Sequence, residues 1–209
     1  FEIFSAVSSA LIAKIPVAHI HGGESTEGVI DESFRHSITK MSHIHFAATE
    51  AYRKRIIQLG ESPDMVFNVG GIGLDNINKL NLLSKVDFEN QINFKLGPKN
   101  ILVTFHPVTL EKSTARVQFQ ELLNSISELK NTKVIFTKAN CDVDGRIINE
   151  MIDEYVCYNK NAIAFTSMGQ LNYLSAMQFI DAVVGNSSSG LIEAPSFKVG
   201  TINIGDRQK

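Results

Sequence analysis

The densest group of reactive side chains lies between Val17 and Met41, a stretch that reads VAHIHGGESTEGVIDESFRHSITKM. His19 and His21 end a short apolar run and are two residues apart, so we expect both imidazoles to leave a strand on one face. Gly22 and Gly23 follow, and glycine lets a backbone turn sharply and approach a ligand closely. Imidazoles at a strand end beside such a turn favour proton-transfer chemistry.

The helix predicted after the glycines carries acids and bases four residues apart. Asp31 and Arg35 form one such pair, and Glu32 and His36 form the other, so each pair is expected to meet on the helix surface. A carboxylate and a guanidinium beside the imidazoles suit proton transfer next to an anionic substrate. Asp31 stands at the helix N-terminus, where an ionised acid is stabilised, which suits it to act as a base. The alternative is a solvated helix face with ordinary ion pairs.

A second candidate site is the run GNSSSGLIEAPS, from Gly185 to Ser196. It follows a predicted strand and opens a predicted helix, so its N–H groups and hydroxyls suit a diphosphate at the positive helix end. It lacks the lysine of a P-loop, so hydrolysis of a nucleoside triphosphate is not implied. Glu193 offers two acceptor oxygens to a pair of ribose hydroxyls. Helix capping by serine is the alternative, but a cap needs only one serine.

Two shorter motifs also follow predicted strands. His106, in TFHPVT, is held extended by the following proline and could donate to a phosphate or act on a sugar, although a lone histidine is often structural. Gly70 to Gly73 resembles a dinucleotide fingerprint only loosely, because the third glycine is missing at its required spacing. We therefore interpret the glycine run as a hinge and not as a nicotinamide site.

The composition excludes several classes of function. The 209 residues are 44% hydrophobic and 20% charged, with a net charge of −2, which favours a globular protein that binds neither nucleic acid nor membrane. Cys141 and Cys157 have no metal-ligand spacing and form no disulfide framework, so a reducing cytoplasm is expected. No apolar run approaches the ~20 residues that span a bilayer.

Histidine is concentrated in the first quarter of the chain, which raises the question of a metal site. His43 and His45 are two residues apart, as are His19 and His21, so paired ligands are geometrically possible. No HExxH motif or cysteine partner accompanies them, and anion binding explains the same residues. We expect no metal and no other cofactor, and we interpret His43 and His45 as strand residues with satisfied hydrogen bonds.

Helical and strand-like patterns alternate along the whole chain. Helices are predicted over 2–14, 31–42, 50–60, 113–129, 144–155, 170–178 and 190–195. Strands are predicted over 16–21, 44–48, 65–69, 101–105, 133–137, 162–165, 182–184 and 201–204. Such alternation favours the α/β class, with parallel sheets covered by helices on both faces.

The alternation falls into two halves, each typical of a doubly wound domain. The stretch between them, 74–94, is polar and rich in asparagine, so we predict a boundary there and divide the chain into 1–73, a linker over 74–99, and 100–209. Ligands of such folds bind at the carboxyl ends of the strands and often lie between domains. His21, His106 and the serine run each follow a strand, so their coincidence predicts a shared site.

The chain resembles the hydrolysing UDP-N-acetylglucosamine 2-epimerases of bacterial sialic and legionaminic acid biosynthesis. The segments that carry the resemblance are HIHGGE, DESFRHSITKMSHIHF, RKRIIQLGE, FHPVT, and GNSSSGLIEAPS with INIGDRQK. The resemblance implies a GT-B fold, in which two Rossmann-like α/β/α domains bind a UDP-sugar in the cleft between them. It also implies that this chain is a fragment, with the first strands of the N-terminal domain and the closing helices outside it.

The resemblance further implies a reaction on a UDP-linked N-acetylated hexosamine, either UDP-N-acetylglucosamine or a 2,4-diacetamido-6-deoxy analogue. The C2 proton is removed, UDP is eliminated to leave a glycal, and water adds to give the free 2-epimeric sugar. The residues implied in UDP binding are His106, Asn186, Ser187, Ser188, Glu193 and Arg207. A homodimer or homotetramer is also implied.

The identity of the proton-transfer pair stays open. The broader family carries glutamate where His21 stands, which leaves Glu24, Asp31 and His21 as candidates, with Arg35 and His106 in the same catalytic set. A GT-B glycosyltransferase would share the nucleotide cradle but would not need the cluster from Asp31 to His36. A non-catalytic nucleotide-sugar-binding protein is the other alternative, in which His21 marks lost chemistry.

Overall fold

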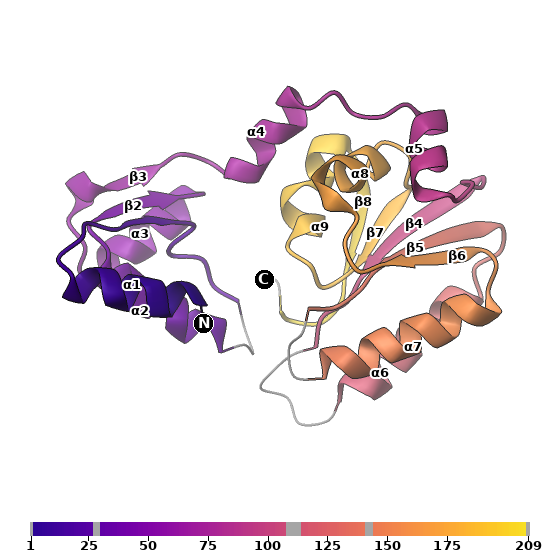
Figure 1. The fold of residues 1–209 in the computed structure, drawn as a ribbon, viewed down its shortest axis with the longest axis horizontal. Helices are drawn as coiled ribbons and strands as arrows, with labels where there is room; N and C mark the ends of the chain where they lie inside the picture. Colours follow the sequence, from indigo (N-terminus) through magenta and orange to yellow (C-terminus); the bar gives the residue numbers. More distant parts are fainter. Residues whose placement is uncertain (1, 27–29, 108–113, 141–143, 208–209) are drawn as a thin grey trace. The chain divides into compact units, whose positions relative to one another are not determined.

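The computed structural model describes residues 2–26, 30–107, 114–140 and 144–207. The chain divides into two compact units, with the division between Asn76 and Ile77. We call the part up to Asn76 unit 1 and the part from Ile77 unit 2, and each is described by itself. Both are built from parallel strands and helices, as Figure 1 shows.

Unit 1 contains a three-stranded parallel sheet in the order β1-β2-β3. The strands pair in register, so that His19 lies beside His45, and His45 lies beside Val66. The strands are β1 (Ala18–Ile20), β2 (Ile44–Ala47) and β3 (Val66–Asn68), and a short 3-10 helix, η1 (Pro63–Met65), precedes the last of them. The helices are α1 (Glu2–Ile12), α2 (Asp31–Met41) and α3 (Glu50–Gln58).

The core of unit 1 is small. Ala47 and Val66 pack against Ile56 of α3, and Thr49 caps that helix by accepting a hydrogen bond from the backbone of Tyr52. Helix α1 is mostly uncovered, since among its described residues only Val7 is buried. The other sheet face also shows apolar groups, which are Ile20 at 49% exposure and Phe67 at 46%.

Two short helices connect the sheets: α4 (Ile72–Lys79) and α5 (Lys85–Ile92). Ser84 caps α5 by accepting a hydrogen bond from the backbone of Asp87, which fixes where the helix begins. Phe88 and Ile92 of α5 are buried in the core of unit 2. The second half of the predicted linker is therefore a packed part of unit 2.

Unit 2 contains a five-stranded parallel sheet in the order β6-β5-β4-β7-β8. The strands are β4 (Lys99–Thr104), β5 (Thr132–Thr137), β6 (Ala162–Phe165), β7 (Ala182–Gly185) and β8 (Gly200–Asn203). The helices are α6 (Ala115–Ser127), α7 (Gly145–Tyr158), α8 (Gly169–Ala176) and α9 (Ser189–Ile192), and a 3-10 helix, η2 (Ala194–Phe197), follows α9. The chain runs outward from β4 in one direction to β6 and then in the other to β8, which is the Rossmann order.

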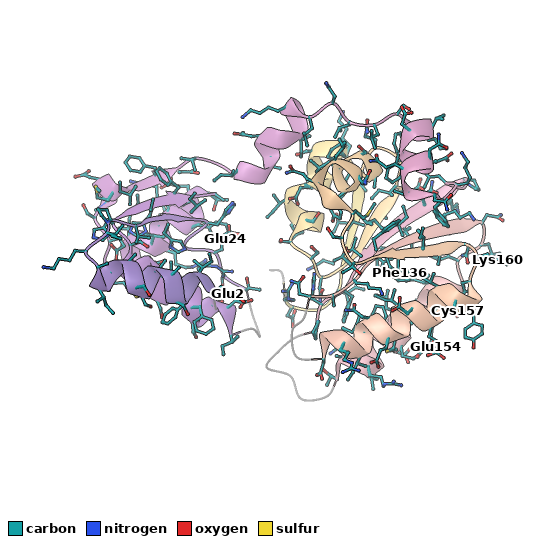
Figure 2. All side chains as sticks on the ribbon, in the orientation of Figure 1. Glu2, Glu24, Phe136, Glu154, Cys157 and Lys160 are labelled. Atoms are coloured by element: carbon teal, nitrogen blue, oxygen red, sulfur yellow. The ribbon has the colours of Figure 1, made fainter. Side chains whose placement is uncertain are left out.

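Both faces of the second sheet are covered. On one face, Val103 and Phe136 pack against α6 and α7, and the ring of Phe136, labelled in Figure 2, meets Tyr155 edge to face at 5.7 Å. On the other face, Leu102 and Ile135 pack against α5 and α8, which lie opposite α6 and α7 in Figure 1. Successive strand residues point to opposite faces, so the nearly continuous apolar strands are buried on both faces of the sheet.

The predicted alternation is confirmed for every strand, with ends that differ by up to two residues. One predicted helix differs in kind: 190–195 consists of the single turn of α9 followed by η2. Pro195 explains the break, because proline has no N–H to continue an α-helix. Within the described residues, no helix is long and apolar enough to cross a membrane.

Candidate active site

The polar groups of unit 2 gather where β4 and β7 end. These strands are neighbours in the sheet, but the chain leaves β4 toward β5 on one side and reaches β7 only later. The carboxyl edge between two such strands is the topological switch point at which open α/β sheets bind ligands. His106 follows β4 by two residues and Asn186 follows β7 directly, so both stand at this point.

Asn186 joins the two strand ends. Its side-chain amide oxygen accepts a 2.7 Å hydrogen bond from the backbone N–H of His106, and its amide nitrogen donates a 2.7 Å bond to the carbonyl of the same residue. The Asn186 backbone N–H also donates to the carbonyl of Thr104 at 3.1 Å. Asn186 is only 1% exposed, so it fixes His106 from within the fold.

Gly185 allows this close approach. Its φ of +138° is a conformation that side chains with a Cβ rarely adopt, and a Cβ there would overlap the carbonyl of Thr104. The glycine that opens the predicted serine motif is therefore required by the backbone.

We call the two hydrogen bonds between the Asn186 side chain and the His106 backbone the clamp. The serine loop, Ser187 to Ser189, directly follows Asn186. The hydroxyl of Ser187 accepts a 3.4 Å bond from the backbone N–H of Ser189, and the Tyr173 hydroxyl donates to the Ser189 hydroxyl at 2.6 Å. Burial raises the pKa of Tyr173. The hydrogen bond with Ser189 opposes this rise, and the charge of Glu193 adds to it. Because α9 is one turn long, any affinity for an anion must come from individual N–H and O–H groups.

A cavity of about 370 Å³ lies at this edge. His106 and Ser187 line it, whereas Ser188 is exposed and does not. The other lining residues come from the ends of β4, β5 and β6 and from the starts of α8 and α9: Thr104, Thr137, Lys138, Asn140, Ser167, Met168, Gly169, Gln170, Tyr173 and Ser189. Most of the lining residues carry a hydroxyl, amide or imidazole group.

Glu193 and Arg207, both predicted to bind UDP, flank the serine loop without lining the cavity. One carboxylate oxygen of Glu193 is buried and has no hydrogen-bond partner among the described residues. Such an acceptor suits a hydroxyl donor supplied by a ligand. Arg207 donates a 3.1 Å bond to the backbone carbonyl of Asn186, so it supports the clamp from the opposite side.

In unit 1, His21 and Glu24 form a hydrogen-bonded pair. Nδ1 of His21 lies 2.7 Å from Oε1 of Glu24, and the two side chains are 40% and 24% exposed. His21 has a φ of +61°, so strand alternation ends before it and its ring turns to Glu24, while His19 contacts Thr39 at 3.2 Å. Gly23, with a φ of +76°, makes the turn between the partners, as expected from its type.

Charged side chains hold the loop that carries Glu24. Both oxygens of Glu32 accept from the Ser25 hydroxyl at 3.0 Å, and one accepts from the backbone N–H of Thr26 at 2.9 Å. Burial raises the pKa of Glu32, but the hydrogen bonds from Thr26, Ser25 and His36 together lower it below its usual range. From the next helix, Arg55 donates to the carbonyl of Gly23.

The structure supports one of the two ion pairs predicted for α2. Glu32 and His36 meet at 3.4 Å, which confirms that pair. The pairing of Asp31 with Arg35 is wrong for the described residues, because Arg35 donates instead to the carbonyl of Glu24 at 3.1 Å and to the Thr26 hydroxyl at 3.4 Å. Asp31 is exposed at the start of α2. Helical spacing brings two side chains within reach, but the loop offered Arg35 more acceptors.

Two further histidines, His19 and His45, lie side by side on β1 and β2. Burial, together with the neighbouring charges of His45, Arg35 and His21, lowers the pKa of His19 to about 4. Burial also lowers the pKa of His45, although Glu61, at 3.4 Å, opposes the change. His43 accepts a hydrogen bond from the backbone N–H of Val17, as expected of a structural residue. The same expectation is wrong for His45, because both of its ring nitrogens are buried without a well-formed hydrogen bond among the described residues. In the described parts of the chain, no cluster of three metal-ligating side chains is found.

Sequence reasoning missed most of the cavity lining, and two of the missed residues, Lys138 and Tyr173, illustrate why. Lys138 directly follows β5, so the rule that singled out His106, a polar residue just past a strand, would also have found it. Tyr173 lies inside α8, where nothing in the sequence distinguishes it from a helical core aromatic.

Comparison with known proteins gives a family match over the whole chain. The family model described as UDP-N-acetylglucosamine 2-epimerase matches residues 1–209. A Campylobacter jejuni protein named GDP/UDP-N,N'-diacetylbacillosamine 2-epimerase (hydrolyzing) is 45% identical over 210 residues, which cover 100% of this chain and 55% of that protein. An Escherichia coli polysialic acid biosynthesis protein is also 45% identical, over 100% of this chain and 53% of its own length.

Solved structures agree on the fold. The Methanocaldococcus jannaschii UDP-GlcNAc 2-epimerase in complex with UDP-GlcNAc and UDP has a TM-score of 0.78 at 20% identity, over 99% of this chain and 58% of that one. The chain therefore has the GT-B-type α/β fold predicted from its sequence. It spans about half the length of the curated relatives it matches.

Proposed function

Because the chain belongs to the UDP-N-acetylglucosamine 2-epimerase family, we propose that it forms part of a hydrolysing 2-epimerase acting on a UDP-linked N-acetylated hexosamine. One observation carries the proposal: His106, Asn186 and the serine loop meet at the switch point of the unit 2 sheet. Hydroxyl and N–H donors at such an edge suit a diphosphate. Ser187 and His106 would contact the UDP group, with Asn186, Ser188, Glu193 and Arg207 around them.

The names of the relatives support the choice of substrate class. One relative is named for UDP-N,N'-diacetylbacillosamine and another for polysialic acid biosynthesis. We therefore assign either UDP-N-acetylglucosamine, converted to N-acetylmannosamine and UDP, or the 2,4-diacetamido-6-deoxy analogue, converted in the same way. Both substrates carry an acetamido group at C2 and UDP at C1, and they differ at C4 and C6.

The reaction would proceed in two balanced steps. A base takes the proton from C2, the electrons of the C–H bond form a C1–C2 double bond, and the C1–O bond breaks to release UDP. Water then adds its hydroxyl to C1 while a proton returns to C2 from the opposite face, which gives the free epimer. The released diphosphate gains negative charge, so donors such as those of Ser187 and His106 stabilise the transition state.

We assign the proton transfer at C2 to His21 with Glu24. A carboxylate that accepts from Nδ1–H holds the neutral ring in the tautomer whose Nε2 lone pair can take a proton. Asp31, which is exposed and carries no such partner among the described residues, is the competing candidate. Arg35 supports the pair through the backbone carbonyl of Glu24.

We also propose a cytoplasmic enzyme that forms a homodimer or homotetramer, with the domain boundary at the start of the predicted linker, 74–99. The family resemblance supports the assembly. Light scattering on the complete gene product tests it, and a monomer at working concentration would contradict it.

Incubation with UDP-N-acetylglucosamine or the diacetamido analogue in deuterated water tests the activity. The complete gene product should release UDP and place deuterium at C2 of the free sugar. Binding without release would favour a nucleotide-sugar-binding protein instead, and transfer of the sugar with its C2 proton retained would favour a glycosyltransferase. The substrate that turns over faster identifies the sugar.

A pair of substitutions assigns the base. Glu24→Gln should lower kcat about 100-fold, since a neutral amide no longer stabilises the imidazolium that forms. Asp31→Asn should leave most of the activity. The reverse result would transfer the role to Asp31.

A further inference from the structure

Lys138 is the cation of the unit 2 cavity. It is the first residue after β5 and lines the cavity together with His106 and Ser187. Among the described residues that line this cavity, no other lysine or arginine is present. A diphosphate carries at least two negative charges, and the remaining lining groups are uncharged or weakly basic. One positive charge in this cavity would therefore strongly increase the affinity for a diphosphate.

The ammonium group of Lys138 is bound to Asp153 of α7. Nζ lies 2.6 Å from one carboxylate oxygen and 2.7 Å from the other. The Lys138 side chain is 20% exposed, whereas the Asp153 side chain is 59% exposed. The carboxylate is therefore mostly in water and can be fully hydrated when its partner leaves, and ion pairs with such an exposed partner contribute little to stability.

Resting on the proposed function, we propose that Lys138 exchanges partners when UDP binds, leaving Asp153 for an oxygen of the diphosphate. The flexible lysine stem permits the change, because its four carbons allow the ammonium to move while the Cα stays at the end of β5. Asp153 thus competes with the nucleotide for one cation. This competition lowers the affinity for free UDP, which is also the product that the enzyme must release.

A structural role for the pair makes different predictions. If Lys138 and Asp153 only fasten α7 to β5, removing either partner would lower the stability alike and leave the affinity for UDP unchanged. If they compete with the nucleotide, the two substitutions act on UDP binding in opposite directions. The sign of the effect therefore separates the two roles.

Calorimetric titration of the complete gene product with UDP and with uridine tests the exchange. Lys138→Gln should weaken UDP binding about tenfold through loss of a charge-assisted hydrogen bond. Asp153→Asn should strengthen it about threefold, because the competing ion pair is gone. Uridine, which lacks the diphosphate, should bind all variants alike.

Two matched variants control for the change of net charge. Glu154→Gln removes a negative charge next to Asp153, and Lys160→Gln removes a positive charge at the amino end of β6; both residues are exposed, and Figure 2 shows them on and just after α7. Neither should change the affinity for UDP. Unchanged or weakened UDP binding by Asp153→Asn, while the wild type binds UDP, would overturn the exchange alone. A wild type that does not bind UDP would overturn the proposed function as well.

Discussion

The two units hold their polar groups in different ways. In unit 2, the strand ends are fixed mainly by neutral side chains and backbone groups, as when the buried amide of Asn186 bonds twice to His106, and Arg207 adds one bond to Asn186. In unit 1, charged side chains hold a loop that is partly in water, as when Glu32 bonds to Ser25 and Thr26. Neutral buried bonds make a rigid frame, whereas groups that exchange protons need contact with water and with other titratable groups.

The cores differ in the same sense. The unit 2 sheet is covered on both faces, by two separate apolar clusters. The described core of unit 1 centres on Ala47, Ile56 and Val66, and part of its sheet is exposed. A well-packed sheet suits the binding of a nucleotide at a fixed place, so substitutions should affect folding most strongly in unit 2.

Gly185→Ala should have the largest effect. The new Cβ would overlap the Thr104 carbonyl at a φ that disfavours any side chain, so we expect unit 2 to lose about 4 kcal/mol of stability or more. Gly205→Ala is the matched control, because Gly205 also has a positive φ but nothing lies near its Cβ position. Denaturant unfolding measures both, and equal losses would show that the close approach is not what matters.

Asn186→Ala should follow. It removes two hydrogen bonds to the backbone of His106, at a total of about 3 kcal/mol, and UDP binding should be lost with the geometry. Asn124→Ala, on the exposed side of α6, should change neither property. If UDP binding survived in Asn186→Ala, the clamp would not be needed to place His106.

Glu32→Ala tests the charged counterpart in unit 1. Loss of its bonds to Ser25 and Thr26 should free the loop of Glu24 and lower kcat about tenfold, with little change in stability because the loop is partly exposed. Glu32→Gln keeps one acceptor oxygen and should recover part of the activity. An unchanged kcat in both variants would show that the loop holds its shape without Glu32.

Acid should weaken unit 1 more than unit 2. The pKa of His19 is about 4 in the folded chain and about 6.5 when unfolded, so between these values only the unfolded chain binds the proton. Stability therefore falls as the pH falls from 6.5 toward 4, by about 1 kcal/mol at pH 5 once partial exposure of the ring is allowed for. NMR titration of the ring measures the pKa directly, and a midpoint near 6.5 would contradict the prediction.

The strands could be predicted well because the spacing of apolar residues along the sequence reflects which side chains of a strand or helix are buried. The sequence also placed His106 and the serine loop at the correct edge, since polar residues after buried strands can lie nowhere else. It did not predict that Arg35 bonds to the carbonyl of Glu24 instead of to Asp31, because the choice of partner depends on which acceptors the folded loop presents. The role of Asn186 was missed for the same reason, since its partner is 80 residues away.

The left-handed backbone at His21 restricts what can be learned by replacing that residue. Few side chains tolerate a φ of +61°, and asparagine, aspartate and histidine are enriched there, whereas β-branched residues are strongly disfavoured. In a random library at position 21, the activity of most variants would therefore reflect whether the side chain tolerates the loop geometry, before it reflects proton transfer. Asparagine, which keeps the backbone acceptable but cannot carry a proton, is the replacement whose effect can be read as chemistry alone.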